Sequence, residues 1–241
     1  RFMSQSNDGP PRPKTFNHMK KIYWLFFTLV LASCTKDKFS SPDNSCFPEE
    51  VSAILTNKCA TAGCHNSQSA ANANGLDYSS WDAMFRGGKN GSSVIPYSTD
   101  FSYMLYFCNV DTSLGIALQP TMPYLKDPLS KQEYETLKNW IAEGAPNCKG
   151  YVNFSDNPER EKFYVCMQPC NKVAVFDAET RVIMRYIDVG NGVGGPHQVR
   201  ITPDGKYWCA VFYQGNVLQV FRTTDDTEVG KITLNNGIRS E

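Results

Sequence analysis

The sequence lacks a net charge, because its 24 lysine and arginine side chains are balanced by 24 aspartates and glutamates. Proteins that bind nucleic acid usually carry an excess of basic residues, so no nucleic-acid partner is expected. Cysteine is also too sparse for a scaffold held by disulfides alone, with nine residues in 241, whereas 41% of the residues are hydrophobic and can bury a core. These features predict a globular protein of one or two domains whose cysteines have a more specific role.

The start of the chain lacks an apolar run of the length that crosses a membrane, which is about 20 residues. Residues 1–18 are polar and proline-rich and are expected to be either a disordered leader or an untranslated one. Residues 19–34 begin with Met19 and two lysines, continue with a shorter apolar run and end at Cys34. This order of basic, apolar and small residues is typical of a secretory signal.

The tetrapeptide that ends this segment, Leu31-Ala32-Ser33-Cys34, resembles a bacterial lipobox. The resemblance implies an exported lipoprotein in which Cys34 carries the lipid that anchors it to a membrane, either in the periplasm or at the outer-membrane surface. A plain N-terminal anchor helix with an incidental cysteine is the alternative. Residues 35–45 follow as a polar tether.

The segment Cys59-Ala-Thr-Ala-Gly63-Cys64-His65 carries the clearest chemical signal. Two cysteines with a histidine directly after the second are typical of c-type haem attachment. The thiols bond to the two vinyl groups on one porphyrin edge, and His65 can place an imidazole nitrogen on the iron. Four residues separate the cysteines where two are usual, and Gly63 helps this longer loop to turn. A zinc site is disfavoured, because adjacent Cys64 and His65 do not easily reach one tetrahedral ion. A Cys59–Cys64 disulfide is an alternative.

A methionine thioether is a common second axial ligand of an electron-carrying haem. Met122 lies between Pro120 and Pro123, which exclude a helix and keep the segment extended, so its thioether can lie over the open haem face. Met84 and Met104 lie in short helix-like apolar stretches, where core packing is the expected role. The predicted axial pair is therefore the motif histidine and Met122, and an iron with both faces occupied carries electrons without binding a substrate.

Two amphipathic patterns flank the motif. Residues 48–58 predict a helix that runs into it, and a capping box at Ser130 and Glu133 opens a second predicted helix. Together with the methionine loop, this order resembles the class I c-type cytochrome domains of Bacteroidetes-type lipoproteins, whose closing helix is similar to LSKQEYETLKNWIAEGAPN here. The resemblance implies an all-α cytochrome c-like domain over residues 46–148, with one covalent haem c.

Three further cysteines lie in this predicted domain. Cys46 and Cys148 bracket it and can form a disulfide that joins the first helix to the last, since those helices pack together in cytochromes c. Cys108 is a competing partner for either one, because connectivity is not readable from sequence.

Residues 151–241 change to short alternating apolar runs that repeat. The stretch that begins at Lys162 aligns with the one that begins at Lys206, and this spacing of about 44 residues is typical of a β-propeller blade. The residue pattern of the two stretches also resembles YVTN-like propeller repeats. Two blades cannot close a ring, so the resemblance implies a truncated, incomplete propeller.

These features together predict a multi-domain chain with an all-α cytochrome c-like domain followed by all-β propeller-type blades. Its expected function is that of an exported c-type cytochrome, which carries single electrons to or from a redox partner protein that the sequence does not identify. Electron transfer is favoured over catalysis in this chain. The alternatives are the electron-entry domain of a propeller oxidoreductase and a non-redox surface lipoprotein whose propeller binds a partner.

Overall fold

A computed structural model describes residues 45–190, 194–213 and 215–234. The chain divides into two units, residues 1–42 and residues 43–241, and every described residue belongs to the second. Outside the described residues lie the predicted leader (1–18), the signal segment with Cys34 (19–34) and the tether (35–45) except for its last residue. No helix within the described ranges is both long enough and apolar enough to cross a membrane.

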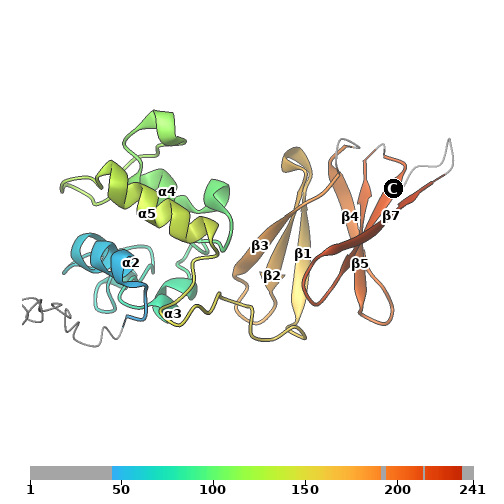
Figure 1. The fold of residues 1–241 in the computed structure, drawn as a ribbon, viewed down its shortest axis with the longest axis horizontal. Coiled ribbons are helices and arrows are strands. Elements are labelled where there is room, and N and C mark those ends of the chain that lie inside the picture. The colour runs from blue at the N-terminus through green and yellow to red at the C-terminus, as the bar shows by residue number, and fades with distance from the viewer. Residues whose placement is uncertain (1–44, 191–193, 214, 235–241) are drawn as a thin grey trace, which may run out of the picture. The chain divides into compact units, whose positions relative to one another are not determined.

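The described chain up to Gly150 consists of short helices joined by long irregular segments (Figure 1). The α-helices are α2 (Glu49–Ile54), α3 (Trp81–Phe85), α4 (Tyr103–Cys108) and α5 (Lys131–Ala142). Single 3-10 turns lie at Ala70–Asn72, Thr99–Phe101 and Thr112–Leu114. Helix α2 continues directly into a π-helical turn, Leu55–Cys59.

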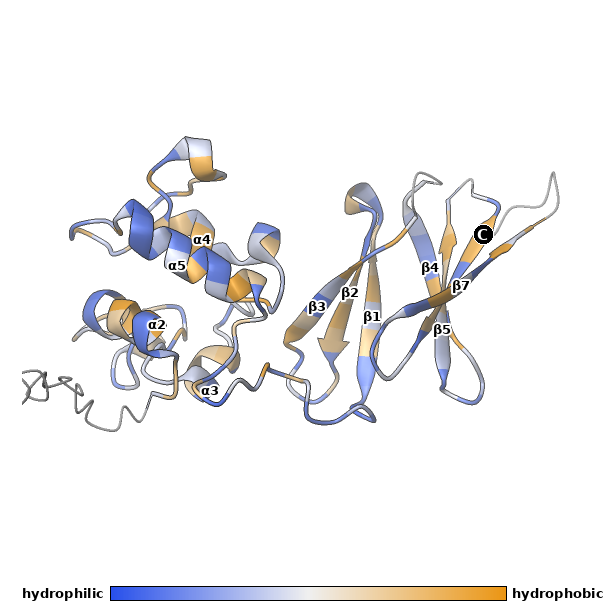
Figure 2. Ribbon diagram, viewed as in Figure 1, coloured by the Kyte–Doolittle hydropathy of each residue, from blue (hydrophilic) through white to orange (hydrophobic). Residues whose placement is uncertain are grey.

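Helix α5 follows the sequence prediction closely. The Ser130 hydroxyl accepts a hydrogen bond from the Glu133 backbone N–H (3.2 Å), and the Glu133 carboxylate accepts one from the Ser130 N–H (2.7 Å), so the predicted capping box is confirmed. Figure 2 shows hydrophobic and hydrophilic residues alternating along this helix. It packs against α2 and α4 through its buried residues Tyr134, Leu137, Trp140 and Ile141.

The two ends of this helical part are joined to each other. A disulfide links Cys46 to Cys148, whose Cα atoms are 4.9 Å apart. The Cys148 N–H also donates to the Cys46 carbonyl (2.7 Å). Trp81 connects both ends to α3, because its backbone N–H donates to Ser45 O (2.7 Å) and its indole N–H donates to Ala145 O (2.8 Å).

The rest of the described chain forms two antiparallel sheets, in which every strand pairs with the next one in sequence. The first contains β1 (Lys162–Met167), β2 (Lys172–Asp177) and β3 (Ile183–Asp188). The second contains β4 (Pro196–Ile201), β5 (Tyr207–Phe212), β6 (Val217–Arg222) and β7 (Glu228–Thr233). The sequence repeat therefore aligns β1, β2 and β3 with β5, β6 and β7.

A buried ion pair joins the first sheet to the turn between β6 and β7. Lys162 Nζ lies 3.2 Å from Asp226 Oδ2, and their side chains are 5% and 0% exposed. Asp226 Oδ1 accepts hydrogen bonds from the Tyr164 hydroxyl and the Trp208 indole N–H, both at 3.0 Å. Arg185 Nε lies 3.8 Å from the other carboxylate oxygen.

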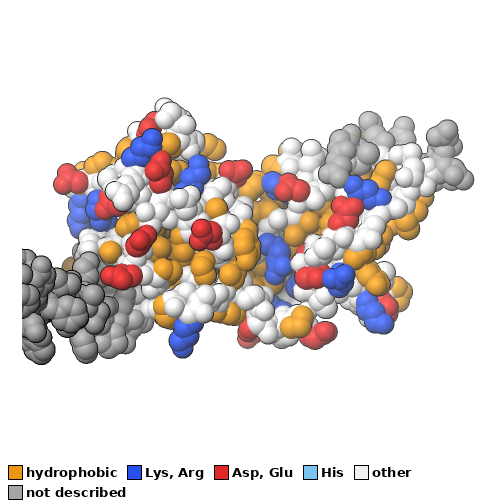
Figure 3. Space-filling model, in the orientation of Figure 1, with side chains coloured by type: hydrophobic (Ala, Val, Ile, Leu, Met, Phe, Trp, Pro, Cys, Tyr) orange, Lys and Arg blue, Asp and Glu red, His pale blue; other side chains and the backbone are white. Residues whose placement is uncertain are grey.

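The charges on the outer surface are of both signs and interspersed on the face shown in Figure 3.

The predicted fold class is wrong, and so is the resemblance to a class I c-type cytochrome domain followed by a YVTN-like propeller. Among the described residues there are four short α-helices and seven strands in two antiparallel sheets, and no all-α cytochrome-like domain is formed. The physical reason is the shortness of the helices. Three of them have five or six residues, too few to be stable without tertiary packing. Most of the chain between them is irregular and rich in glycine, proline and asparagine.

Candidate functional site

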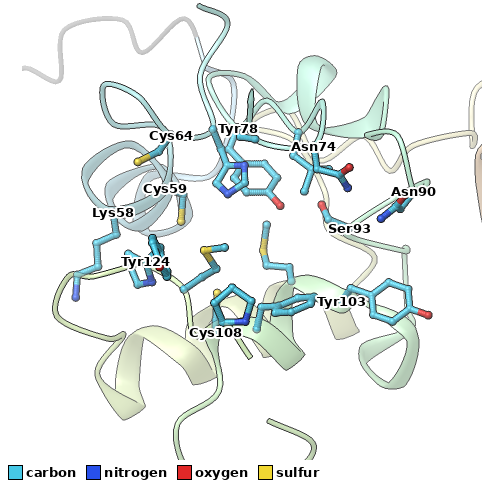
Figure 4. Close-up of a pocket in the computed structure, with 18 of the residues that line it drawn as sticks. Lys58, Cys59, Cys64, Asn74, Tyr78, Asn90, Ser93, Tyr103, Cys108 and Tyr124 are labelled. Carbon is cyan, nitrogen blue, oxygen red and sulfur yellow. The ribbon is translucent and has the colours of Figure 1, made fainter. Parts of the chain in front are cut away.

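A cavity of about 860 Å³ lies in the helical part, a size typical of cofactor and small-molecule sites (Figure 4). All three motif residues, Cys59, Cys64 and His65, line it. Met122, far away in the sequence, lines it as well. The four residues that the sequence predicts for haem binding therefore share one cavity.

The π-helical turn places Cys59 at the cavity wall. This turn is closed by a hydrogen bond from Ala60 N–H to Leu55 O (2.8 Å). π-Helical turns are rare and often occur at functional sites. Cys59 is buried, and both burial and the nearby Cys64 thiol raise its pKa to about 12, so it is a neutral thiol at physiological pH. Cys59 and Cys64 are both free in the structure, and no disulfide joins them.

The four-residue spacer between the cysteines folds into a compact loop. Cys64 N–H donates to Thr61 O (3.0 Å), and His65 N–H donates to Cys59 O (3.1 Å). Gly63 has a φ of +79°, in the left-handed region that glycine adopts without a steric penalty. The backbone therefore closes the longer spacer and holds the histidine directly beside the first cysteine.

His65 packs against Tyr78, with ring centroids 4.9 Å apart and planes inclined by 37°. The Tyr78 N–H donates to the His65 carbonyl (2.8 Å), which fixes the two residues together. Burial lowers the pKa of His65, although a hydrogen bond with the Leu76 backbone acts in the opposite direction. Its Nδ1 atom is buried and makes no hydrogen bond of normal geometry to any described residue. The ring is therefore neutral near pH 7, and neutral imidazole is the form that binds metals.

Two methionines, and not one, line the cavity. Met122 lies in an irregular, partly buried segment that is held to α4 by a hydrogen bond from its own N–H to Phe107 O (2.8 Å). Met104 is in α4, is 5% exposed and lines the cavity too. Met84 is buried in α3 and does not line it. Met104 is thus a second thioether that the sequence assigned only to the core.

Several other residues that line the cavity were not predicted from the sequence. Cys108 is a buried free thiol whose pKa is raised to about 12 by burial and by nearby Cys59. Tyr103 and Tyr124 line the cavity and are 53% and 59% exposed. On the opposite side from the motif cysteines lie amide and hydroxyl side chains (Figure 4). A glycine-rich turn at 87–91 also borders the cavity through Asn90 and Gly91.

The residues present fit a covalently held haem. Within the described ranges there is no cluster of three or more His, Cys, Asp or Glu side chains suited to a bare metal ion. A haem iron takes its equatorial ligands from the porphyrin, so the protein needs to supply only one or two. The cavity offers a neutral histidine, three free thiols (Cys59, Cys64 and Cys108) and two thioethers. This donor set matches that requirement.

No protein-family model matches the chain, and no curated protein matches it either. Among solved structures, a chain of hydrazine synthase from Kuenenia stuttgartiensis is similar, with 26% sequence identity and a TM-score of 0.29. The match covers 31% of this chain and spans 21% of the length of that one. A TM-score this low establishes neither a shared fold nor a shared function.

Proposed function

We propose that this protein binds one haem c covalently in the cavity and carries single electrons. The observation that supports the proposal is the convergence of Cys59, Cys64, His65 and Met122 on the same cavity. Spacing alone brings the first three together, but Met122 reaches the cavity only through the fold. A chance cysteine pair beside a histidine would not require a thioether there.

Each motif residue has a defined task in this proposal. The Cys59 and Cys64 thiols would hold the haem covalently, because each S–H can add across one vinyl double bond, with sulfur bonding to one carbon and hydrogen to the other. His65, in its neutral form, would supply an imidazole nitrogen to the iron. Met122 would supply a thioether sulfur to the iron, and Met104 is the structural alternative. When bound, haem supplies reversible one-electron chemistry between ferrous and ferric iron.

The surroundings of the motif support attachment at this loop. The hydrogen bonds that close the loop place the histidine next to Cys59, so few backbone degrees of freedom remain to be ordered during attachment. Cys59 is neutral and buried, which protects it from oxidation before attachment. The apolar core that surrounds it excludes water from one side of the cavity.

The proposal includes export and a lipid anchor at Cys34, with a separate redox protein as the partner. The disulfide between Cys46 and Cys148 supports an oxidising compartment, because disulfides persist outside the cytoplasm. The periplasm and the outer-membrane surface both provide such conditions.

The test is to export the full chain in a host that has haem c maturation machinery. We expect haem to remain with the polypeptide in denaturing gels, together with a c-type absorption spectrum that changes on reduction. The variants Cys59→Ala and Cys64→Ala should each lose one thioether bond, and the double variant should lose covalent haem. Cys170→Ala is the matched control, because Cys170 is a free, exposed cysteine outside the cavity. Absence of covalent haem in the unmodified chain would sink the proposal and favour a non-redox lipoprotein.

A further inference from the structure

The side of the cavity away from the cysteines is lined by neutral polar side chains. We call this set the amide–hydroxyl end, and it consists of Asn74, Asn90, Ser92 and Ser93. Figure 4 shows three of them, Asn74, Asn90 and Ser93, across the cavity from Cys59 and Cys64. None of the four belongs to the haem motif.

The glycine-rich turn at 87–91 creates this end by lying against the segment 74–76. Lys89 N–H donates to Asn74 O at 2.8 Å. A Cβ atom at Gly88 would lie only 2.6 Å from the same oxygen, so a side chain at this position would force the two segments apart. The close contact brings Asn74 and Asn90 to the same rim of the cavity.

The two serines of this end are buried, and one of them has an unsatisfied hydroxyl. Ser92 and Ser93 are 7% and 6% exposed, and the Ser92 hydroxyl makes no hydrogen bond of normal geometry within the described chain. Ser93 faces the Tyr78 hydroxyl, and although burial raises the pKa of Tyr78, a hydrogen bond from the Ser93 side chain opposes that rise. Buried hydroxyls without partners are costly, and a ligand that accepts hydrogen bonds at this end would remove the cost.

Cationic side chains are held at the other end of the cavity. Lys58 Nζ lies 2.9 Å from the Glu133 carboxylate, and Lys126 Nζ donates to Thr61 Oγ1 (2.9 Å) within the loop between the cysteines. Lys58 and Lys126 are the only lysines or arginines among the described residues that line the cavity. The amide–hydroxyl end therefore offers hydrogen-bond donors without a positive charge.

The charged groups near this end are also engaged elsewhere or lie outside the cavity wall. Lys89, in the glycine-rich turn, donates to Ala71 O (3.5 Å), and Arg86 lies 3.8 Å from Asp77. None of these three charged residues lines the cavity. The titratable groups that do face this end are the hydroxyls of Tyr78 and Tyr103, and burial raises the pKa of Tyr78 above its usual range.

We infer that the amide–hydroxyl end binds the two carboxylates of haem through neutral donors alone, an inference that rests on the proposed function. Haem carries its carboxylates on the edge opposite to its vinyl groups. Attachment of the vinyl edge at Cys59 and Cys64 directs the carboxylates to the far side of the cavity, where Figure 4 shows the amide–hydroxyl end. The amide N–H and hydroxyl groups donate to the carboxylate oxygens, and the unpaired Ser92 hydroxyl gains an acceptor.

A carboxylate held by neutral donors has a measurable signature. No cation stabilises its ionised form, so its pKa depends on the hydrogen bonds themselves. Ionisation of a carboxylate near the iron favours the ferric state, so the reduction potential falls as the pH rises through that pKa. The loss of one hydrogen-bond donor should raise the carboxylate pKa, and with it the pH at which the reduction potential falls, by about one unit. The reason is that a hydrogen bond to an ionised group contributes a free energy similar to that of one pKa unit.

The experiment measures the reduction potential against pH for the haem-loaded full chain and its Ser92→Ala/Ser93→Ala variant. We expect full covalent attachment of haem in both proteins. In the variant, the pH at which the reduction potential falls should be higher by about one to two units. Ser67→Ala is the control, since Ser67 is an exposed serine near His65 that does not line the cavity, and its profile should match that of the unmodified chain. Without haem, Ser92→Ala alone should unfold at the same denaturant concentration as the unmodified chain or at a higher one, because it removes an unsatisfied buried hydroxyl.

The outcomes separate the two proposals. Covalent haem with an unshifted profile in the double variant overturns the carboxylate inference and leaves the proposed function intact. No covalent haem in the unmodified chain overturns both. If only the serine variant fails to take up haem, the single variants Asn74→Asp and Asn90→Asp provide the test, because these two residues are exposed. A carboxylate added beside the haem carboxylates must also move the fall to higher pH, and an unchanged profile contradicts the inference.

Discussion

Replacement of Asp226 by asparagine should cost about 3–5 kcal/mol in the free energy of unfolding, the range for removing one partner of a buried ion pair. The asparagine oxygen can still accept from Tyr164 and Trp208, which both donate to Oδ1 in the wild-type protein. Its amide nitrogen would replace Oδ2, which lies 3.2 Å from Lys162 Nζ. The asparagine NH2 group and the Lys162 ammonium group, both hydrogen-bond donors, would then face each other. The Lys162 side chain, which is 5% exposed, would carry a charge without its carboxylate partner.

The assay is urea denaturation of the full chain, with hydrogen exchange in β5 and β6 to locate the loss. Asp204→Asn is the control, because the Asp204–Lys206 pair is 3.9 Å long and largely exposed, and such pairs contribute at most about 1 kcal/mol. Adding Lys162→Met to Asp226→Asn should recover much of the loss, since the buried charge is then removed. The reasoning is refuted if Asp226→Asn costs no more than the control, or if the second substitution recovers nothing.

Three further predictions concern the cavity and the fold. Met122→Leu should abolish the sulfur-to-iron absorption band of the oxidised protein while Met104→Leu retains it, and both swaps should cost less than about 1.5 kcal/mol of stability; the reverse spectra would make Met104 the ligand. Cys46→Ser should lower the free energy of unfolding by about 4–5 kcal/mol in urea, the value for a disulfide that closes a loop of about 100 residues, and a chemical reductant should have no additional effect on this variant. Although burial raises the pKa of Asp177, hydrogen bonds from Thr180 and Arg160 hold it below its usual range. The stability that Asp177 contributes is thus present above pH of about 4 and is lost as the pH falls through its lowered pKa, so urea titrations from acid to neutral pH should show the gap between wild type and Asp177→Asn closing in acid.

The helices show how far local patterns reach. A capping box and a full apolar stripe specify α5, because twelve residues give the 3.6-residue period room to appear. Residues 48–58 show the same type of face, but periodicity cannot reveal that the helix changes to a π-turn after Ile54, since that change depends on one extra backbone residue. The fold class was mispredicted because similar short patterns were combined into a familiar domain order, although tertiary packing decides how much helix forms.

The cavity shows a second limit. Cys59, Cys64 and His65 are adjacent enough in sequence for their chemistry to be read directly. Met104 could not be distinguished from a core residue, because a buried methionine on a helix has the same sequence pattern whether it faces protein or cofactor. Ser92 could not be predicted as a cavity residue for a different reason. Its place at the cavity follows from the contact between the turn at 87–91 and the segment 74–76, which no local sequence pattern encodes.

The Cys46–Cys148 disulfide has a consequence for the integrity of the molecule. Every residue that lines the cavity lies between these two cysteines in sequence. A protease that cuts the exposed segment around Leu125, which is 86% exposed, would therefore produce two polypeptide fragments that stay covalently connected. The cavity walls contributed by each fragment would remain tethered, and the break would become visible as two bands only after reduction. Such a closed covalent ring lets a nicked chain persist as one molecule.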